Sequence, residues 1–121
     1  MQIEVSNGEI VDKFTILMIK KDKIKDAAKL INVNKEIETL EPIVASIPYH
    51  TFDYTDLIDV NTLLWEVEDV LRIHEERKDF GEYFIALARQ VYKLNDQRAR
   101  IKKKINIETN SQLIEEKSYK Q

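Results

Sequence analysis

Nine polar residues lie at or beside positions where the helical pattern of this 121-residue chain predicts apolar side chains. The clearest of them is Arg98, which falls within an apolar stripe from Phe84 to Ile105. An unpaired buried charge is costly, so a buried Arg98 needs a carboxylate, and Asp12 or Asp69 is the natural partner. Such a network can serve the fold alone or line a pocket for a small polar ligand. The set predicted to bind a ligand is Asn7, Glu9, Asp12, Lys13, Glu68, Asp69, Asn95, Asp96 and Arg98.

Two pairs of acidic residues form a second pattern, Glu38 with Glu41 and Glu66 with Asp69. Side chains three residues apart share one face of a helix, so two such pairs facing each other can hold Mg²⁺. The spacing resembles that of the all-α nucleoside triphosphate pyrophosphohydrolases, which implies a Mg²⁺-dependent enzyme as an alternative function. Acids are 22 of the 121 residues, however, so such pairs also arise by chance on solvated faces. We predict no cofactor unless this alternative holds, and then only Mg²⁺.

The run RARIKKK at residues 98–104 contains five bases and no acid. It can bind phosphate or nucleic acid, or it can be a solvated helix end where cations suit the helix dipole. The chain has a net charge of −3 and no aromatic residue within the run, so we favour the solvated end and expect no nucleic-acid partner. Residues 53–82 hold ten acids and three bases, which predicts that this segment packs beside the basic run.

The two histidines, His50 and His74, have no metal-binding spacing. His74 falls on an apolar stripe, as satisfied core histidines do, and His50 is a weak candidate for a general base. The sequence has no Cys, no G-x-S-x-G, no P-loop and no G-x-G-x-x-G motif. A helical enzyme like chorismate mutase is a distant alternative, because only Arg89, Arg98 and Lys13 offer cations for a dicarboxylate. We therefore favour a protein that is not an enzyme.

Helices must position these residues, because apolar side chains recur at helical spacing along most of the chain. Ser6 and Glu9 predict a capping box, in which the Ser6 hydroxyl accepts from the Glu9 amide and Glu9 reaches back. Pro42 predicts a kink or an end near Glu41, and Asp79 is predicted to cap the last long helix. The expected elements are helices near 7–25, 26–45, 57–78 and 80–106, an ordered loop at 46–56, and a short C-terminal helical turn at 112–117 capped by Ser111.

The fold class predicted is all-α, a four-helix bundle-like arrangement of two helical hairpins in a single domain over residues 1–121. Two Gly and two Pro are too few for the turns of an all-β fold. The first helix is apolar almost all round, so it is central or lies in an interface, and we expect a homodimer through it. We expect neither a signal peptide nor a membrane partner, and hence a cytoplasmic protein.

Four segments, in order along nearly the whole chain, resemble the motifs of a small family of unknown function found in bacteria and phages. They are VSNGEIVDKFTILMIK at 5–20, LWEVED at 64–69, FIALAR at 84–89 continued by Val91, Tyr92, Asn95 and Asp96, and EEKSY at 115–119. Phe14 replaces the usual leucine of the opening motif, and Met18 replaces the usual acidic residue.

The resemblance implies a helical fold and an association with the synthesis of surface polysaccharides, but no established activity. The family's recurring polar residues fall on Lys20 and on the nine residues predicted above, whereas Glu38 and Glu41 lie outside the pattern. We therefore predict a non-catalytic helical binding or accessory module, whose partner is a protein or a small polar ligand. The alternative is the Mg²⁺-dependent pyrophosphohydrolase, with Glu38, Glu41, Glu66 and Asp69 as metal ligands.

Overall fold

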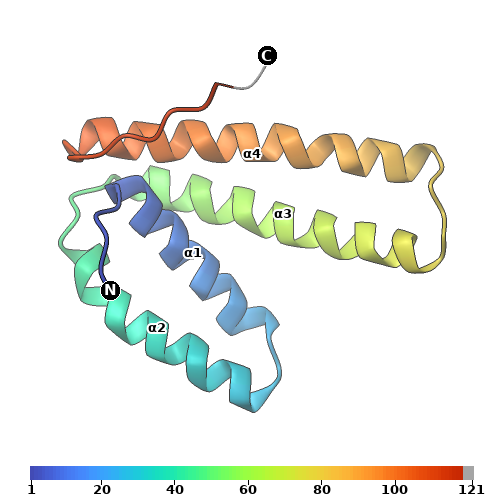
Figure 1. Ribbon diagram of the computed structural model, residues 1–121, viewed down its shortest axis with the longest axis horizontal. Coiled ribbons are helices and arrows are strands. Elements are labelled where there is room, and N and C mark those ends of the chain that lie inside the picture. The colour runs from blue at the N-terminus through green and yellow to red at the C-terminus, as the bar shows by residue number, and fades with distance from the viewer. Residues whose placement is uncertain (119–121) are drawn as a thin grey trace.

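The computed structural model describes residues 1–118, and this part of the chain forms four α-helices and no strand. Figure 1 shows two helical hairpins that meet at one end of the molecule, which confirms the predicted class and architecture. The far end of the second hairpin, residues 66–93, extends beyond the first hairpin, and we call it the arm. The helices are α1 (Asn7–Lys23), α2 (Ala27–Ala45), α3 (Thr51–Glu76) and α4 (Glu82–Glu108).

Helix α1 is the central element, because it packs against α2, α3 and α4. Helix α2 packs on α1 alone, and α3 packs along α4. Three neighbouring helices explain why α1 is apolar almost all round. Its buried positions are therefore covered within the chain, and the expected homodimer through this helix stays a prediction.

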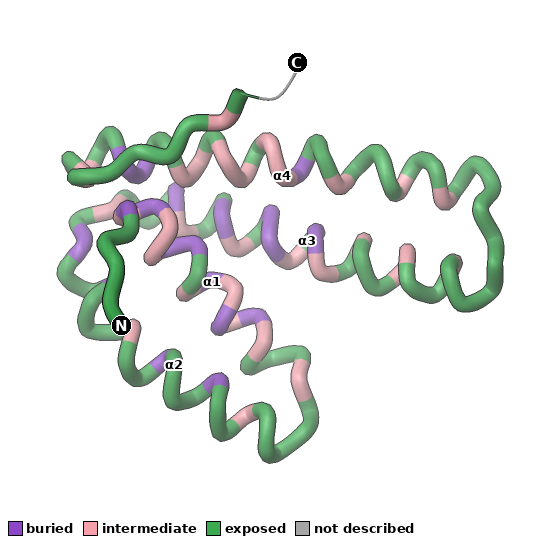
Figure 2. The backbone as a smooth tube through the Cα atoms, viewed as in Figure 1, coloured by how far each residue is buried: buried purple, intermediate pink, exposed green. Residues whose placement is uncertain are grey.

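The core consists of three small apolar clusters rather than one continuous layer. The first joins α1, α3 and α4 where the two hairpins meet, the second joins α1 to α2, and the third joins α3 to α4. Figure 2 shows that the buried positions are concentrated near α1, while most of the arm is exposed. The buried residues of the three clusters are Val11, Ile47, Leu57 and Ile105, then Leu17, Val33 and Ile37, and finally Val60, Leu64 and Leu94.

Helix α3 begins six residues earlier than the sequence pattern predicts, so the expected loop at 46–56 is reduced to residues 46–50. The first turns of α3 bury Asp53 and Leu57 and half-bury Tyr54. A buried carboxylate at Asp53 interrupts the apolar period, and this is why the start of the helix is not visible in the hydrophobic pattern.

Other predicted boundaries also need correction. Helix α1 ends at Lys23 instead of Lys25. Helix α2 ends at Ala45, as the range 26–45 predicts, but it does not end near Glu41, since it continues through Pro42. Asp79 does not cap α4, whose N-cap residue is Gly81. The backbone N–H of Asp79 donates instead to the His74 carbonyl oxygen at 3.0 Å and closes the end of α3. Residues 112–117 form no helical turn and instead run alongside α4 (Figure 1).

Glycine is required at one point of the hairpin junction. A Cβ atom on Gly8 of α1 would lie 2.3 Å from the backbone oxygen of Lys102 on α4. The two helices can approach this closely only because residue 8 has no side chain. In the described part of the chain, no helix combines the length and apolar character needed to cross a bilayer.

Candidate functional site

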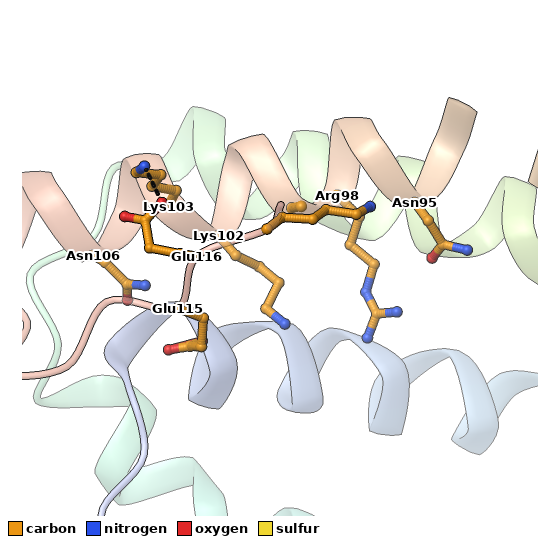
Figure 3. Close-up of a pocket in the computed structure, with 9 residues that line it drawn as sticks. Asn95, Arg98, Lys102, Lys103, Asn106, Glu115 and Glu116 are labelled. Atoms are coloured by element: carbon orange, nitrogen blue, oxygen red, sulfur yellow. Dashed lines mark hydrogen bonds and ion pairs between the residues drawn. The ribbon is translucent and has the colours of Figure 1, made fainter. Parts of the chain in front are cut away.

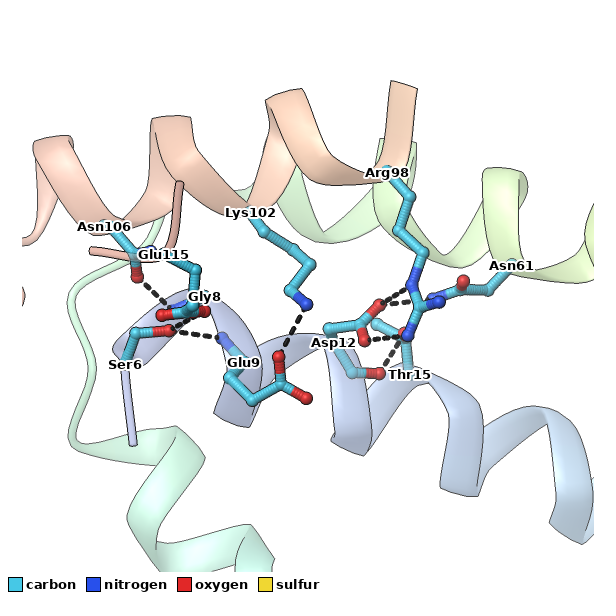
Figure 4. A network of polar contacts seen from close by, with 10 residues as sticks. All are labelled: Ser6, Gly8, Glu9, Asp12, Thr15, Asn61, Arg98, Lys102, Asn106 and Glu115. Carbon is cyan, nitrogen blue, oxygen red and sulfur yellow. Dashed lines mark hydrogen bonds and ion pairs between the residues drawn. The ribbon is translucent and has the colours of Figure 1, made fainter. Parts of the chain in front are cut away.

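The polar centre of the molecule is an ion pair between Arg98 of α4 and Asp12 of α1 (Figure 4). Arg98 Nε donates to Asp12 Oδ1 at 2.9 Å, and Nη2 donates to Oδ2 at 2.5 Å. Asp12 is only 1% exposed, and Asn61 Nδ2 of α3 also donates to its Oδ1, at 2.9 Å. The predicted partnership of Arg98 with Asp12 is therefore confirmed, and one carboxylate joins three helices.

The surroundings of this pair keep Arg98 charged. The hydrogen bonds to Asp12 raise the pKa of the guanidinium, and they outweigh the opposing effect of desolvation. Asn61 Nδ2 also donates to Thr15 Oγ1 at 2.9 Å, and Thr15 Oγ1 donates to the backbone oxygen of Asp12 at 2.7 Å. The carboxylate thus lies in a network whose buried polar atoms have partners, as a buried charge requires.

The N-terminus of α1 is tied to the last turns of α4 by side chains. Gly8 N donates to Asn106 Oδ1 at 2.6 Å, and Asn7 Nδ2 donates to Thr109 Oγ1 at 2.9 Å. Asn7 N donates to Ser111 Oγ at 3.0 Å, just beyond α4. These bonds satisfy the free amides of a helix start and hold both hairpins together.

Half of the predicted capping box is present. Ser6 Oγ accepts from Glu9 N at 3.1 Å, as expected, but the Glu9 side chain does not reach back. Its Oε2 accepts instead from Lys102 Nζ of α4 at 2.5 Å. The ion pair to the neighbouring helix replaces the local capping contact.

A groove of about 380 Å³ lies along α4 between α1 and the C-terminal segment 111–118 (Figure 3). Its lining includes four cationic side chains and only two carboxylates, although the whole chain carries a net charge of −3. Two asparagines add amide groups. The lining residues are Asn95, Arg98, Ala99, Lys102, Lys103, Asn106, Glu115, Glu116 and Lys117.

Comparison with known proteins identifies the family to which the chain belongs. The whole chain, residues 1–121, matches the model of a family of unknown function, DUF6165. The chain is a member of the DUF6165 family. This confirms the resemblance to a family of unknown function that the motifs indicated. No curated protein and no solved structure matches the chain.

Six of the nine residues predicted to bind a ligand in this DUF6165 chain lie where α1, α4 and segment 111–118 meet. Arg98 and Asn95 line the groove, and Asp96 pairs with Lys117 Nζ at 2.6 Å. The other three of these six, described above, are Asn7, Glu9 and Asp12.

The remaining three predicted residues lie outside this group. Lys13 pairs with Glu36 of α2 at 3.7 Å, and Asp69 pairs with Arg72 on its own helix at 3.8 Å. Glu68 is exposed on α3 and contributes only a distant charge to the pKa of Arg98. Since Lys13 and Arg98 have separate partners, the cations of the chorismate-mutase alternative do not converge.

The two acidic pairs of the pyrophosphohydrolase alternative are not brought together. Glu38 and Glu41 lie exposed on α2, whereas Glu66 and Asp69 lie exposed on α3, and these two helices do not pack on each other. Within residues 1–118, no three His, Asp or Glu side chains are grouped so that they can hold a metal ion. The shared face that this alternative requires is absent from the described part of the chain.

The basic run at 98–104 is solvated only in part, because Arg100, Lys103 and Lys104 are exposed while Arg98 and Lys102 are half-buried. Four of its five cations have carboxylate partners, Arg98 and Lys102 on the α1 side and Lys103 and Lys104 elsewhere. Lys104 Nζ lies 3.1 Å from Asp53 Oδ1, so the predicted packing of the acidic segment beside the basic run is confirmed. The sequence alone does not show that each of these bases pairs with a different carboxylate.

The two histidines have different surroundings. His74 is half-buried between Tyr83 and Phe84, and its Nδ1 lies 3.1 Å from the Asp79 carbonyl oxygen, as expected of a satisfied histidine. His50 is the N-cap residue of α3, and its exposed ring lies 3.8 Å from Glu108 Oε2. Neither histidine lines the groove.

Sequence reasoning missed several residues of the site. Asn61 and Asn106 are buried asparagines on helices, and their polarity at core positions was the available signal. Glu115, Glu116 and Lys117 belong to the EEKSY motif, whose presence in a family pattern marked the segment without showing its partner. Tyr119, the last residue of that motif, lies outside the described residues.

A second charged cluster lies where the start of α3 meets the end of α4. Asp53 is 1% exposed, and its Oδ2 has no hydrogen-bond partner among the described residues. Glu108 lies beside it, and interaction with the Asp53 carboxyl group raises the pKa of Glu108, with desolvation acting in the same direction. Lys104 and His50 oppose this rise. The arrangement favours the protonated form of Glu108.

The first prediction concerns Asp12→Ala, which leaves the Arg98 guanidinium half-buried without its partner. We expect a loss of about 3 kcal/mol in the free energy of unfolding, measured by urea denaturation. Asp69→Ala is the matched control, because its exposed contact with Arg72 contributes little, and we expect a change within about 0.5 kcal/mol. Equal losses in the two variants would contradict a structural role for the Arg98–Asp12 pair.

The second prediction concerns pH. A group whose pKa is raised in the folded state stabilises the fold at low pH, and this contribution is lost as the pH rises through the folded pKa. Glu108→Gln mimics the protonated form and can donate to Asp53 Oδ2, so we expect a higher Tm than wild type at about pH 7 and no gain at about pH 4. Thermal scans across this range, with exposed Glu76→Gln as the control, measure it. A Tm that falls at about pH 7 would contradict a raised pKa of Glu108 in the folded state.

Proposed function

We propose that this chain is a non-catalytic binding module that holds a small anionic ligand in the groove between α4, α1 and segment 111–118. The observation that carries the proposal is the excess of cations in the groove: Arg98, Lys102, Lys103 and Lys117 against Glu115 and Glu116. The volume of about 380 Å³ is within the usual range of small-molecule sites. It suits a ligand that carries one or two phosphate or carboxylate groups.

The cations of the groove divide into an inner and an outer set. Arg98 is committed to the buried Asp12 and therefore serves to position the wall of the groove. Lys102 and Lys103 pair with carboxylates that are themselves exposed or half-exposed, Glu9 and Glu116. A phosphate can replace the carboxylate in these ion pairs with little loss of folding free energy, because ion pairs near the surface contribute little to stability. The nearby N-terminus of α1 adds a favourable dipole for an anion.

The lining of the groove supports binding rather than catalysis. Its described residues include no histidine, hydroxyl or thiol that can act as a nucleophile next to a base. Its two carboxylates are engaged by Ser6 and Lys103. The resemblance described above implies an association with surface-polysaccharide synthesis, so we propose an accessory role there, with a nucleotide sugar as the ligand class to test first.

The third prediction is a shift in thermal stability with nucleotides, nucleotide sugars or polyphosphates, each with and without Mg²⁺. A ligand at 100 times its Kd stabilises the fold by about 2.7 kcal/mol, which is several degrees for a chain of this size. Lys103→Gln should reduce the shift, whereas Lys93→Gln, on the arm part of α4, should leave it unchanged. A flat panel, or equal shifts in both variants, would contradict the proposal.

The same panel tests the alternative function. A nucleotide shift that requires Mg²⁺, is abolished by Glu66→Ala and is insensitive to Lys103→Gln would favour the pyrophosphohydrolase. Our proposal expects the opposite sensitivity, because Glu66 is remote from the lining residues of the groove.

We also propose that two copies of the chain associate through the outer face of α4 in the arm. Ile85 and Tyr92 are 54% and 55% exposed there. Together with Ala88 they follow the 3–4 spacing of a helix-pairing seam.

Charge favours an antiparallel arrangement of the two α4 helices. Arg89 precedes Tyr92 by three residues and Asp96 follows it by four, on the same side of the seam. When two copies pair antiparallel about Tyr92, Arg89 of each faces Asp96 of the other. Asp96 keeps Lys117 as a second neighbour within its own chain. This proposal places the expected homodimer on α4 instead of on the central helix α1.

The fourth prediction is the oligomeric state in solution. Sedimentation equilibrium should show a dimer that Tyr92→Lys converts to a monomer, because a charge in the seam opposes pairing. Phe52→Lys is the matched control, since Phe52 is an exposed aromatic residue at the opposite end of the molecule, and it should leave the dimer intact. A wild-type monomer at all concentrations would overturn this proposal and leave the ligand proposal untouched.

A further inference from the structure

Segment 111–118 is attached to the two hairpins almost entirely by polar contacts. It is extended, and its larger apolar residues, Leu113 and Ile114, are exposed. The contacts that hold it beyond Ser111 are those of Glu115, Glu116 and Lys117. The contact of Glu116 is exposed and that of Glu115 is part-buried, and neither residue belongs to an apolar cluster. Both carboxylates can therefore leave their partners without disturbing the three clusters.

The carboxylates of this segment lie where the anionic groups of a ligand would lie. Glu115 Oε1 accepts from Ser6 Oγ at 2.6 Å, and Ser6 is the N-cap residue of α1 (Figure 4). Glu116 Oε2 accepts from Lys103 Nζ at 2.9 Å, on the other side of the groove (Figure 3). One carboxylate is therefore at the positive end of a helix dipole, and the other is on a cation of the groove.

We propose that segment 111–118 is an internal competitor for the groove, in which Glu115 and Glu116 stand in for the two anionic groups of the ligand. The inference rests on the function proposed above and specifies how that site is regulated. A ligand with two linked anionic groups, such as a diphosphate, displaces both carboxylates from Ser6 and Lys103, while the ion pair of Lys117 with Asp96 keeps the end of the segment beside the groove. A ligand with one anionic group displaces only one of them and binds more weakly.

Competition has a measurable consequence for affinity. When only a fraction of the molecules has an open groove, the apparent Kd equals the intrinsic Kd divided by that fraction. Removing the two carboxylate charges enlarges the open fraction. The double variant Glu115→Gln/Glu116→Gln should therefore bind pyrophosphate more tightly than wild type, by about tenfold if the segment is bound in about nine molecules of ten.

The test combines calorimetry with backbone ¹⁵N relaxation by NMR on the full chain, with pyrophosphate as the probe. The control is Glu75→Gln/Glu76→Gln, which makes the same change in net charge on the distant arm. We expect tighter pyrophosphate binding in the segment variant alone. We also expect faster backbone motion of residues 112–116, measured by ¹⁵N relaxation, in that variant without ligand and in wild type when pyrophosphate is added.

The outcomes separate this inference from the function on which it rests. If wild type binds pyrophosphate and the segment variant binds it equally or more weakly, competition is overturned while the binding function stands. Unchanged ¹⁵N relaxation of residues 112–116 in the variant overturns it as well. If neither protein binds pyrophosphate and the panel of ligands is flat, the proposed function itself fails, and the competition with it.

Discussion

The ion pair between Arg98 and Asp12 is the interaction on which the arrangement of this molecule depends. It joins the central helix α1 to α4, and Asn61 brings α3 to the same carboxylate. Because Asp12 is almost completely buried, the two hairpins can meet only where Arg98 reaches it. Gly8, one helical turn earlier on α1, permits the close contact of the two helices. The position of the groove along α4 follows from this one crossing point.

The charges of α4 serve two purposes at different depths. Arg98 is satisfied within the protein, and this satisfaction fixes the wall of the groove. Lys102 and Lys103 reach carboxylates near the surface, which a competing anion can replace. A chain with a net negative charge can therefore present a local positive site, because its acids are concentrated on other segments, chiefly at residues 53–82.

Much of the fold follows from local patterns in the sequence, and the site follows only in part. Residues close together in the sequence determine the helical spacing, the start of α1 at Ser6 and the start of α2 at Asp26. These features are therefore visible in the sequence. The partner of Arg98 was also predictable, since a buried charge has few possible partners. The start of α3 was not, because buried Asp53 breaks the apolar period. The contacts of Glu115 and Glu116 join residues 109 and 13 positions apart, and no local pattern encodes such separations.

NMR of the arginine Nε–H groups tests directly whether Arg98 is a structural cation while Lys102 and Lys103 face the ligand. We predict that the Arg98 Nε–H exchanges much more slowly with water than that of Arg100, which has no carboxylate partner among the described contacts. When pyrophosphate is added, the Arg98 Nε–H should keep its slow exchange, while the chemical shifts of the backbone amides of Lys102 and Lys103 change. Fast exchange at Arg98, or loss of its protection when pyrophosphate binds, would show that the ion pair is not the fixed centre of the structure.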